Sequence, residues 1–203
     1  PEHPPAAPYW QEIGGDVLKV EVLRDSGGGV SSIVMQQGPL TVRRVVLDHA
    51  RLAEALALSE DAFEADLAPV VASTGTAHLQ VVLRDAALVD RVAPRHAELK
   101  ALLASAGAEG CYVIALTAAA SVDVYARFFN PTVGLWEDPA TGTAAGPLSA
   151  WLVGEGRLPS DRHVRIEQGR AAGRPSIIDV EIRQDRPAIH GQCIVVASGE
   201  LFV

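Results

Sequence analysis

The residues of this sequence best suited to chemistry lie in one short segment, 137–147, which reads EDPATGTAAGP. Two adjacent acids and a rigid proline precede a hydroxyl–glycine–hydroxyl triplet, small residues and an apolar run at 148–153 that is typical of a helix. The first N–H groups of a helix have no partner inside it, and the helix dipole favours negative charge there. A carboxylate beside such a terminus, Asp138, is suited to moving a proton on a bound acid.

Residue type predicts individual roles within this segment. We expect one of the two acids, Glu137 and Asp138, to be structural and the other to face a ligand. Gly142 lets a ligand approach the backbone closely. Thr143 is expected at the helix N-cap as a hydrogen-bond donor, because no evident base stands beside it to make it a nucleophile. Pro147 fits only in the first turn, where its missing N–H costs little. An ordinary loop-to-helix junction uses many of the same residues, so both interpretations stay open at this point.

The histidines offer one further candidate. His78 follows Gly75-Thr76 and enters an apolar strand, so it is either a hydrogen-bonded structural residue or one that faces a site. His49 and His96 fall on predicted helices and His163 in a loop, which favours surface or capping roles. The sequence has no HExxH motif and no close His/Cys/Asp cluster, so we expect no metal. It has no GxSxG motif of a serine hydrolase either.

Composition limits the class of protein. The chain has 203 residues, 48% of them hydrophobic, which is enough for a sizeable core. A net charge of −8, without a basic stripe and interleaved aromatics, argues against nucleic acid as a partner. No apolar run approaches the ~18 residues of a membrane span, and no signal peptide opens the sequence. Cys111 and Cys193 lie in apolar runs without metal-ligand spacing, which indicates buried free thiols in a cytoplasmic, reducing setting.

The elements that must position these residues are mostly strands. Predicted strands are 17–23, 30–36, two pieces within 70–83, 111–117, 122–129, 164–168, 177–183 and 191–197. Predicted helices are 47–58, a short one or a turn at 85–92, 96–106 ending at Gly107, and 148–153. Gly27–Gly29 is expected to be a hairpin turn, since no helix or GK[ST] follows it. Hairpins mixed with helices favour a largely antiparallel α+β architecture over a doubly wound sheet.

The segment at 137–148 also resembles a family motif. The PhzF-like family, named for the phenazine-biosynthesis isomerase, has an aromatic-Pro-x-x-Gly segment and then Glu-Asp-x-Ala-Thr-Gly-Ser/Thr-Ala-x-Gly-Pro-Leu. This chain has FNPTVG at 129–134 and EDPATGTAAGPL at 137–148. Further matching segments are 168–169, 173–176 and 191–201, and the resemblance extends from about Tyr9 to Val203.

The resemblance implies the α+β fold of diaminopimelate epimerase. That fold has two pseudo-equivalent domains, each a curved, mostly antiparallel sheet wrapped around a central helix, with the active site between them. It also implies cofactor-independent proton transfer, usually in a homodimer. Asp138 would be the catalytic acid–base residue. Gly142 and Thr143 would hold the carboxylate of a small substrate. Beside the resemblance, we expect Ala144 and His78 to be substrate-binding residues as well.

The N-terminal part departs from the family pattern. Family members are longer there, in a part that contains a Gly-Asn-Pro segment, the proton-shuttling glutamate and a Gly-His-Pro-Thr segment. His3-Pro4 is similar to the last of these but lies too close to the strands that follow. We therefore predict a remnant of the first domain at 1–40, a complete second domain at 41–187, and a terminal strand at 188–203 that returns to the first domain. The chain would then be a fragment, part of a split enzyme, or a short relative completed by a partner chain.

Three functions are compatible with these residues. The leading hypothesis is a PhzF-like isomerase, or its C-terminal portion. It would catalyse an acid–base proton shift on a small cyclic carboxylate in phenazine- or antibiotic-type secondary metabolism, without metal or nucleotide. The alternative is a non-catalytic carboxylate-binding or assembly subunit that lacks the shuttling glutamate. A further alternative is an amino-acid epimerase, although Cys111 and Cys193 lack the Gly-rich surroundings of the cysteine pair such enzymes use.

Overall fold

The computed structural model describes residues 8–13, 15–119, 121–184, 186–192, 196–197 and 199–200. The strands are β1 (Tyr9–Ile13), β2 (Asp16–Arg24), β3 (Val30–Gln36), β4 (Thr41–Arg44), β5 (Val70–Ser73), β6 (Ala77–Leu83), β7 (Gly110–Leu116), β8 (Val124–Asn130), β9 (Leu135–Asp138), β10 (Val164–Gln168), β11 (Ser176–Arg183) and β12 (Arg186–Gly191). The helices are α1 (His49–Leu56), a 3-10 turn η1 (Glu60–Ala62), α2 (Ala86–Arg91), α3 (His96–Ala106) and α4 (Gly142–Gly154).

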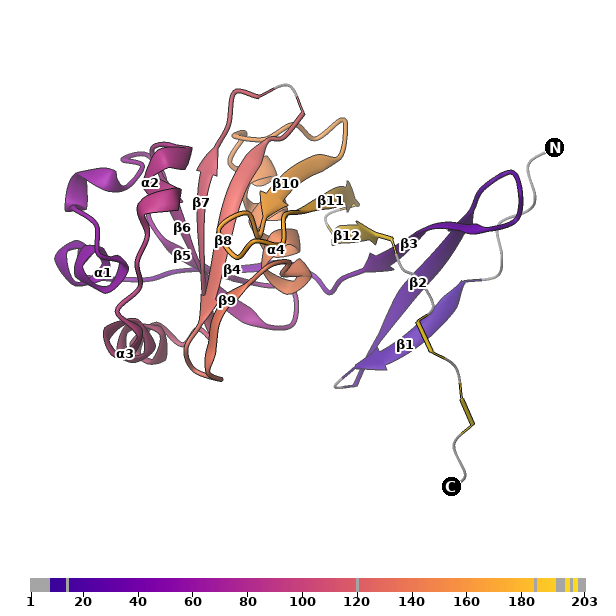
Figure 1. Cartoon of the computed structure of the whole chain (residues 1–203), viewed down its shortest axis with the longest axis horizontal. Helices are drawn as coiled ribbons and strands as arrows, with labels where there is room; N and C mark the ends of the chain where they lie inside the picture. Colours follow the sequence, from indigo (N-terminus) through magenta and orange to yellow (C-terminus); the bar gives the residue numbers. More distant parts are fainter. Residues whose placement is uncertain are drawn as a thin grey trace.

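The strands form one mixed sheet in the order β1-β2-β3-β12-β11-β10-β8-β7-β6-β5-β4, with β9 paired to β8. Neighbours are mostly antiparallel, while β6 pairs with β7 and β10 with β8 in parallel. Figure 1 shows α1, α2 and α3 on one side of the large sheet, α4 on the other, and β1–β3 extending away from both. The predicted α+β class with a largely antiparallel sheet is confirmed.

Two hydrophobic cores lie on the two faces of this sheet. Side chains alternate along a strand, so β7 directs Val113 toward α1–α3 and Tyr112 toward α4. Leu52 and Leu103 belong to the first core and Leu148 to the second, and all three are fully buried. The sheet is therefore covered on both faces in the region that holds α4.

Local signals in the sequence explain the ends of the helices. Asp48 caps α1 by accepting the N–H groups of Ala50 and Arg51. Gly107 ends α3 with a φ of 63°, the left-handed conformation that glycine adopts at no steric cost. Helix α3 has the bounds expected from the sequence, whereas α4 begins six residues earlier than the predicted 148–153.

The last strand is the clearest error in the predicted elements. The sequence predicted a strand at 191–197, but β12 runs from Arg186 to Gly191, and residues 192, 196 and 197 are not in a strand. Residues 193–195, and with them Cys193, lie outside the described residues. The cause is a tight hairpin that pairs Arg183 with Arg186 and so begins β12 directly after β11. Gln184 takes a φ of 55° in that turn, which no glycine in the sequence signalled.

Cys111 follows the prediction of a buried free thiol. Its side chain lies in the core of β7, and burial raises the pKa of the thiol to about 12. A thiol in this state stays protonated at neutral pH and is unsuited to acid–base chemistry.

Strands β1–β3 have an apolar face that no helix in the described part of the chain covers. Tyr9, Leu18, Val20, Val22 and Met35 share this face by strand register, and each is exposed or half-buried. It continues the face of β12 that packs against α4, since Met35 pairs with Ile189. The proposed boundaries at residues 40 and 187 stay a prediction, because the strands on both sides belong to the same sheet.

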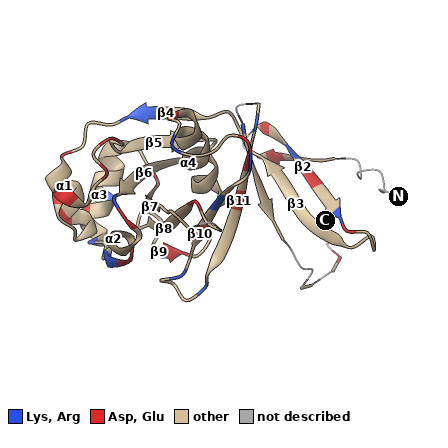
Figure 2. Ribbon diagram, turned by 90° about the horizontal axis from the view of Figure 1, so that it is seen from above, with Lys and Arg blue, Asp and Glu red and all other residues tan. Residues whose placement is uncertain are grey.

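Charged residues are distributed over several elements. Figure 2 shows Lys and Arg on β2, β4 and other elements, interspersed with Asp and Glu rather than gathered in one stripe. Among the described residues, no helix is both long and apolar enough to cross a membrane.

Candidate functional site

Helix α4 begins at Gly142, and the N-cap position is occupied by Thr141, not by Thr143 as predicted. Thr141 does not cap the helix with its side chain, because its hydroxyl donates to Asp138 Oδ2 at 2.7 Å. Thr143 lies in the first turn and is exposed. The expected cap is therefore replaced by a contact that fixes the carboxylate of Asp138.

The first N–H groups of α4 divide into two pairs. Those of Ala144 and Ala145 donate to the carbonyl of Thr141, at 3.2 and 3.0 Å. Those of Gly142 and Thr143 have no hydrogen-bond partner among the described residues. Two free N–H groups at the positive end of a helix can hold an anion. Ala144 has no group left for a ligand, since its side chain is also fully buried.

Pro147 lies at the sixth position of α4, beyond the first turn in which we expected it. Its missing N–H leaves the carbonyl of Thr143 without its usual helical donor. The first turns are supported from outside, because Gln37 Nε2 donates to the carbonyl of Gly142 at 3.0 Å. Gly146 makes this approach possible, since a Cβ there would lie 1.8 Å from Gln37 Oε1. The end of β3 thus lies against the start of α4.

Gln168 is the hydrogen-bonding centre beneath Asp138. Its side chain is fully buried, and its Nε2 donates to the Asp138 carbonyl at 2.6 Å and to Thr141 Oγ1 at 2.9 Å. Its Oε1 accepts from the Tyr112 hydroxyl at 2.9 Å and from the Thr141 N–H at 3.3 Å. Burial, with the charge of Asp138, raises the pKa of Tyr112, so this phenol stays a donor. The network fixes the backbone that precedes α4.

Glu137 is structural. Arg127 binds it through two hydrogen bonds, Nε to Oε1 at 2.9 Å and Nη2 to Oε2 at 2.8 Å. Arg127 Nη1 also donates to the carbonyls of Val89 and Val92, beyond β8 at the end of α2. Of the two adjacent acids, Asp138 is thus the one that faces α4, and its Oδ1 has no hydrogen-bond partner in the described part of the chain.

His78 reaches the same helix start from β6. Its Nε2 lies 3.1 Å from Thr143 Oγ1, and its ring packs edge-on against Phe128, with centroids 5.0 Å apart. The histidine is almost fully buried, which lowers its pKa to about 4 and keeps it neutral at pH 7. A neutral imidazole can orient the Thr143 hydroxyl without adding charge.

The structure therefore brings Asp138, Gly142, Thr143 and His78 together. Sequence reasoning missed the residues that support them, Gln168, Tyr112 and Gln37. Gln168 stood in a segment that matched the family motif, which was the only hint of its position. Gln37 follows β3, 105 residues from its partner Gly142, and nothing local distinguished it.

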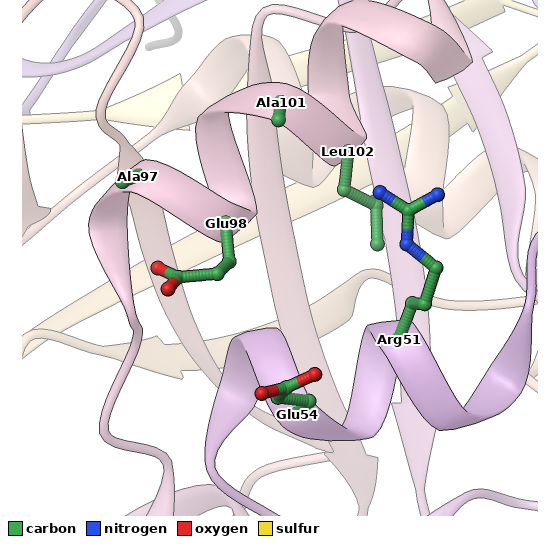
Figure 3. A pocket seen from close by; sticks show the side chains of 6 residues that line it. All are labelled: Arg51, Glu54, Ala97, Glu98, Ala101 and Leu102. Carbon is green, nitrogen blue, oxygen red and sulfur yellow. The ribbon is translucent and has the colours of Figure 1, made fainter.

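A separate hollow lies between α1 and α3, on the face of the sheet opposite α4. Figure 3 shows it lined by Arg51, Glu54, Ala97, Glu98, Ala101 and Leu102. Glu54 is already paired with Arg95 at 2.7 Å and is exposed. Ala97 and Glu98 lie in the first turn of α3, but the described residues form no hydrogen-bond network at the hollow comparable to that around Asp138.

Comparison with known proteins shows the family of the chain. A family model described as phenazine biosynthesis-like protein, PhzC-PhzF, matches residues 7–199. The chain belongs to this family. Relatives include an uncharacterized isomerase of Clostridium acetobutylicum, 29% identical over 96% of this chain and 67% of that protein. Another, from Deinococcus radiodurans, is 36% identical over 83% of this chain and 58% of that protein.

One PhzF-family relative has a named reaction. The trans-2,3-dihydro-3-hydroxyanthranilate isomerase of Pseudomonas chlororaphis is 30% identical over 79% of this chain and 53% of that protein. This chain thus spans between about half and two thirds of the length of these relatives.

Solved structures show the same fold. A PhzF-family phenazine biosynthesis protein of Bacillus anthracis has a TM-score of 0.78 at 22% identity, over 97% of this chain and 69% of that one. A hydroxyproline epimerase of Agrobacterium vitis has a TM-score of 0.55 at 13% identity, over 95% of this chain and 58% of that one. The PhzF chain therefore has the diaminopimelate epimerase-like fold expected from the sequence.

Proposed function

We propose that this chain supplies the acid–base carboxylate and the anion-binding helix start of an isomerase that shifts a proton on a small cyclic carboxylic acid. The observation that supports the proposal is the setting of Asp138. Its carboxylate is half-buried, and Thr141 donates to Oδ2, while Oδ1 and the N–H groups of Gly142 and Thr143 have no hydrogen-bond partner among the described residues.

The proposed chemistry uses these groups in turn. The substrate carboxylate accepts hydrogen bonds from the N–H groups of Gly142 and Thr143 and from the Thr143 hydroxyl, which His78 orients. Asp138 Oδ1 then takes a proton from, or returns one to, a neighbouring carbon. The family resemblance implies a glutamate as the second proton carrier, in the longer N-terminal part of family members. No metal or nucleotide enters this scheme.

The substrate class follows from the named relative. We propose a small cyclic amino or hydroxy acid, of the kind to which trans-2,3-dihydro-3-hydroxyanthranilate belongs, in secondary metabolism. Amino-acid epimerisation through a thiol is less well supported, because Cys111 is buried in β7 and stays protonated.

Solvent-isotope exchange tests the proposal. Trans-2,3-dihydro-3-hydroxyanthranilate is incubated in deuterated water with this 203-residue chain and with an extended form that adds an N-terminal part of the kind found in longer family members. We expect the extended form to place deuterium in the product, and Asp138→Asn to lower the rate at least a hundredfold. Asp66→Asn, at an exposed acid, is the matched control. The proposal fails if the extended form deuterates neither this compound nor any other cyclic amino or hydroxy acid.

Calorimetry with small carboxylates distinguishes the non-catalytic alternative. Binding that depends on Thr143 and occurs without turnover, even in the extended form, would favour a carboxylate-binding or assembly subunit. Binding followed by deuterium incorporation supports the isomerase.

We further propose that the apolar face of β1–β3 is covered in the working enzyme, by a second copy of the chain or by a partner chain. On the edge strand β1, Tyr9 lies on this face and is 58% exposed, and an exposed apolar face at a sheet edge favours association. Light scattering after size exclusion measures the mass directly. A monomer at all concentrations, in both forms of the chain, would contradict this proposal.

A further inference from the structure

A second group of chemically active side chains lies on the outer face of the sheet. His163 directly precedes β10, Glu181 lies on β11 and His190 lies on β12, three adjacent strands. Strand register puts their side chains on the face opposite α4, because Val164, Val180 and Ile189 point into the core beneath that helix. The group is therefore independent of Asp138 and of the proposed isomerase.

The three side chains converge on one point. His190 Nε2 lies 3.1 Å and His163 Nε2 3.8 Å from the same carboxylate oxygen, Oε2 of Glu181. The donor atoms of all three residues lie within 4.8 Å of one another, and the two imidazole rings have centroids 4.4 Å apart. Two histidines brought this close repel each other when both are charged, unless an anion or a shared ligand lies between them.

The two separations from Glu181 are close to those in a divalent metal site. Ligands at 2.0–2.1 Å from a tetrahedral Zn²⁺ lie about 3.3 Å apart, which falls between the two distances to Glu181 Oε2. Two histidines and one glutamate form a ligand set that zinc accepts, with a fourth position left for water. His190 is mostly buried, with 14% of its side chain exposed, while His163 is 44% exposed and free to close on a metal.

Arg183 sets the strength of such a site. Its Nε donates to Glu181 Oε2 at 2.7 Å, and its Nη1 binds Glu21 on β2. The guanidinium fixes the Glu181 carboxylate in place but also puts a positive charge beside the metal position. Asp179, whose side chain lies on the same face, is held by Arg165 at 2.9 Å. Removing the Arg183 charge should therefore strengthen cation binding.

We propose that His163, Glu181 and His190 form a Zn²⁺-class metal site that ties together strands β10, β11 and β12. A metal bound there would hold β12 in place, and β12 is the strand that joins β3 to the rest of the sheet. Metal binding to the folded chain raises its stability in proportion to occupancy.

Metal titration of the whole chain tests this site. After treatment with EDTA, the chain is titrated with Zn²⁺ by calorimetry and with Co²⁺ by visible absorption. We expect one equivalent of Zn²⁺, tetrahedral-type Co²⁺ bands and a higher midpoint of thermal unfolding. His163→Asn and His190→Asn should each weaken Zn²⁺ binding at least tenfold, and Arg183→Gln should tighten it. His49→Asn, at an exposed histidine on α1, should leave binding unchanged.

Two outcomes would overturn the proposal. One is an unaltered Zn²⁺ affinity in the double variant His163→Asn/His190→Asn, which would place binding elsewhere. The other is no saturable binding in the parent chain, which would make the group a hydrogen-bonded cluster alone. His163 precedes β10 and 44% of its side chain is exposed, so the variant His163→Asn should still fold. This variant therefore tests the site even if His190→Asn, in β12, fails to fold.

Discussion

Glu137 and Asp138 are consecutive residues of β9, yet their carboxylates lie on opposite faces of the sheet. Glu137 binds Arg127, which reaches the end of α2, whereas Asp138 accepts from Thr141 at the start of α4. Alternation along a strand explains this separation. One acid is therefore committed to an ion pair in the core, and the other has an oxygen free for chemistry.

Substituting the two acids should change the free energy of unfolding by very different amounts. Glu137→Ala leaves the guanidinium of Arg127 buried without its partner, and we expect a loss of about 3–5 kcal/mol in the free energy of unfolding. Asp138→Asn should change that free energy by less than about 1 kcal/mol, because the Thr141 hydroxyl can still donate to the amide oxygen. Urea denaturation measures both values. Equal losses in the two variants would contradict the assignment of roles.

Gln168 should be more important for stability than any one of its partners. Gln168→Leu removes the partner of the Tyr112 hydroxyl, the Thr141 N–H and the Asp138 carbonyl in a buried region, at a cost of about 2–4 kcal/mol. Tyr112→Phe removes one donor only and should cost about 1 kcal/mol. Denaturation of both variants, with calorimetry of a small carboxylate, checks this order. A smaller cost for Gln168→Leu than for Tyr112→Phe would show that the network is not cooperative.

The buried His78 predicts a pH dependence of stability. Burial lowers its pKa from 6.5 to about 4 in the folded chain, so the unfolded chain binds more protons between these values. The free energy of unfolding should lose little from His78 above pH 6.5 and should fall as the pH drops toward 4. The loss from this residue should be about 2.5 kcal/mol at pH 4.5.

A matched variant isolates this contribution. His78→Gln retains a donor near Thr143 but does not titrate, so its urea midpoint should fall less between pH 7 and pH 4.5 than that of the parent. The same pH slope in both chains would mean that His78 is accessible to protons in the folded state.

Two glycines of α4 should respond in opposite ways to alanine. At Gly146 the added Cβ would collide with Gln37, whose Oε1 would lie 1.8 Å away, so we expect Gly146→Ala to destabilise the chain and shift the start of α4. At Gly154 nothing lies within 4 Å of the added Cβ, so Gly154→Ala should be neutral or stabilise by up to about 1 kcal/mol. Thermal unfolding of the two variants measures the difference. A tolerated Gly146→Ala would show that Gln37 can leave α4.

Much of the fold was predictable because its signals are local. Helix α3 and its Gly107 terminus, the Gly27–Gly29 hairpin and the strand at Val164–Gln168 each depend on residues next to one another. The same holds for Asp138 and Gly142, whose types and spacing indicated a helix start beside an acid. The predicted bounds of the last strand, 191–197, were wrong because β12 begins after a turn in which Gln184, not a glycine, adopts a left-handed conformation.

The sequence by itself indicated the residues of the candidate site, since Asp138, Gly142 and Thr143 lie within six positions, at the end of β9 and the start of α4. Only the tertiary structure decided what holds them. Gln37, His78 and Gln168 come from three distant strands or strand ends, and their contacts depend on sheet register. It also decided which of the two adjacent acids is structural. Alternation along β9 puts the two carboxylates on opposite faces, but the sequence does not show which of these faces contains Arg127.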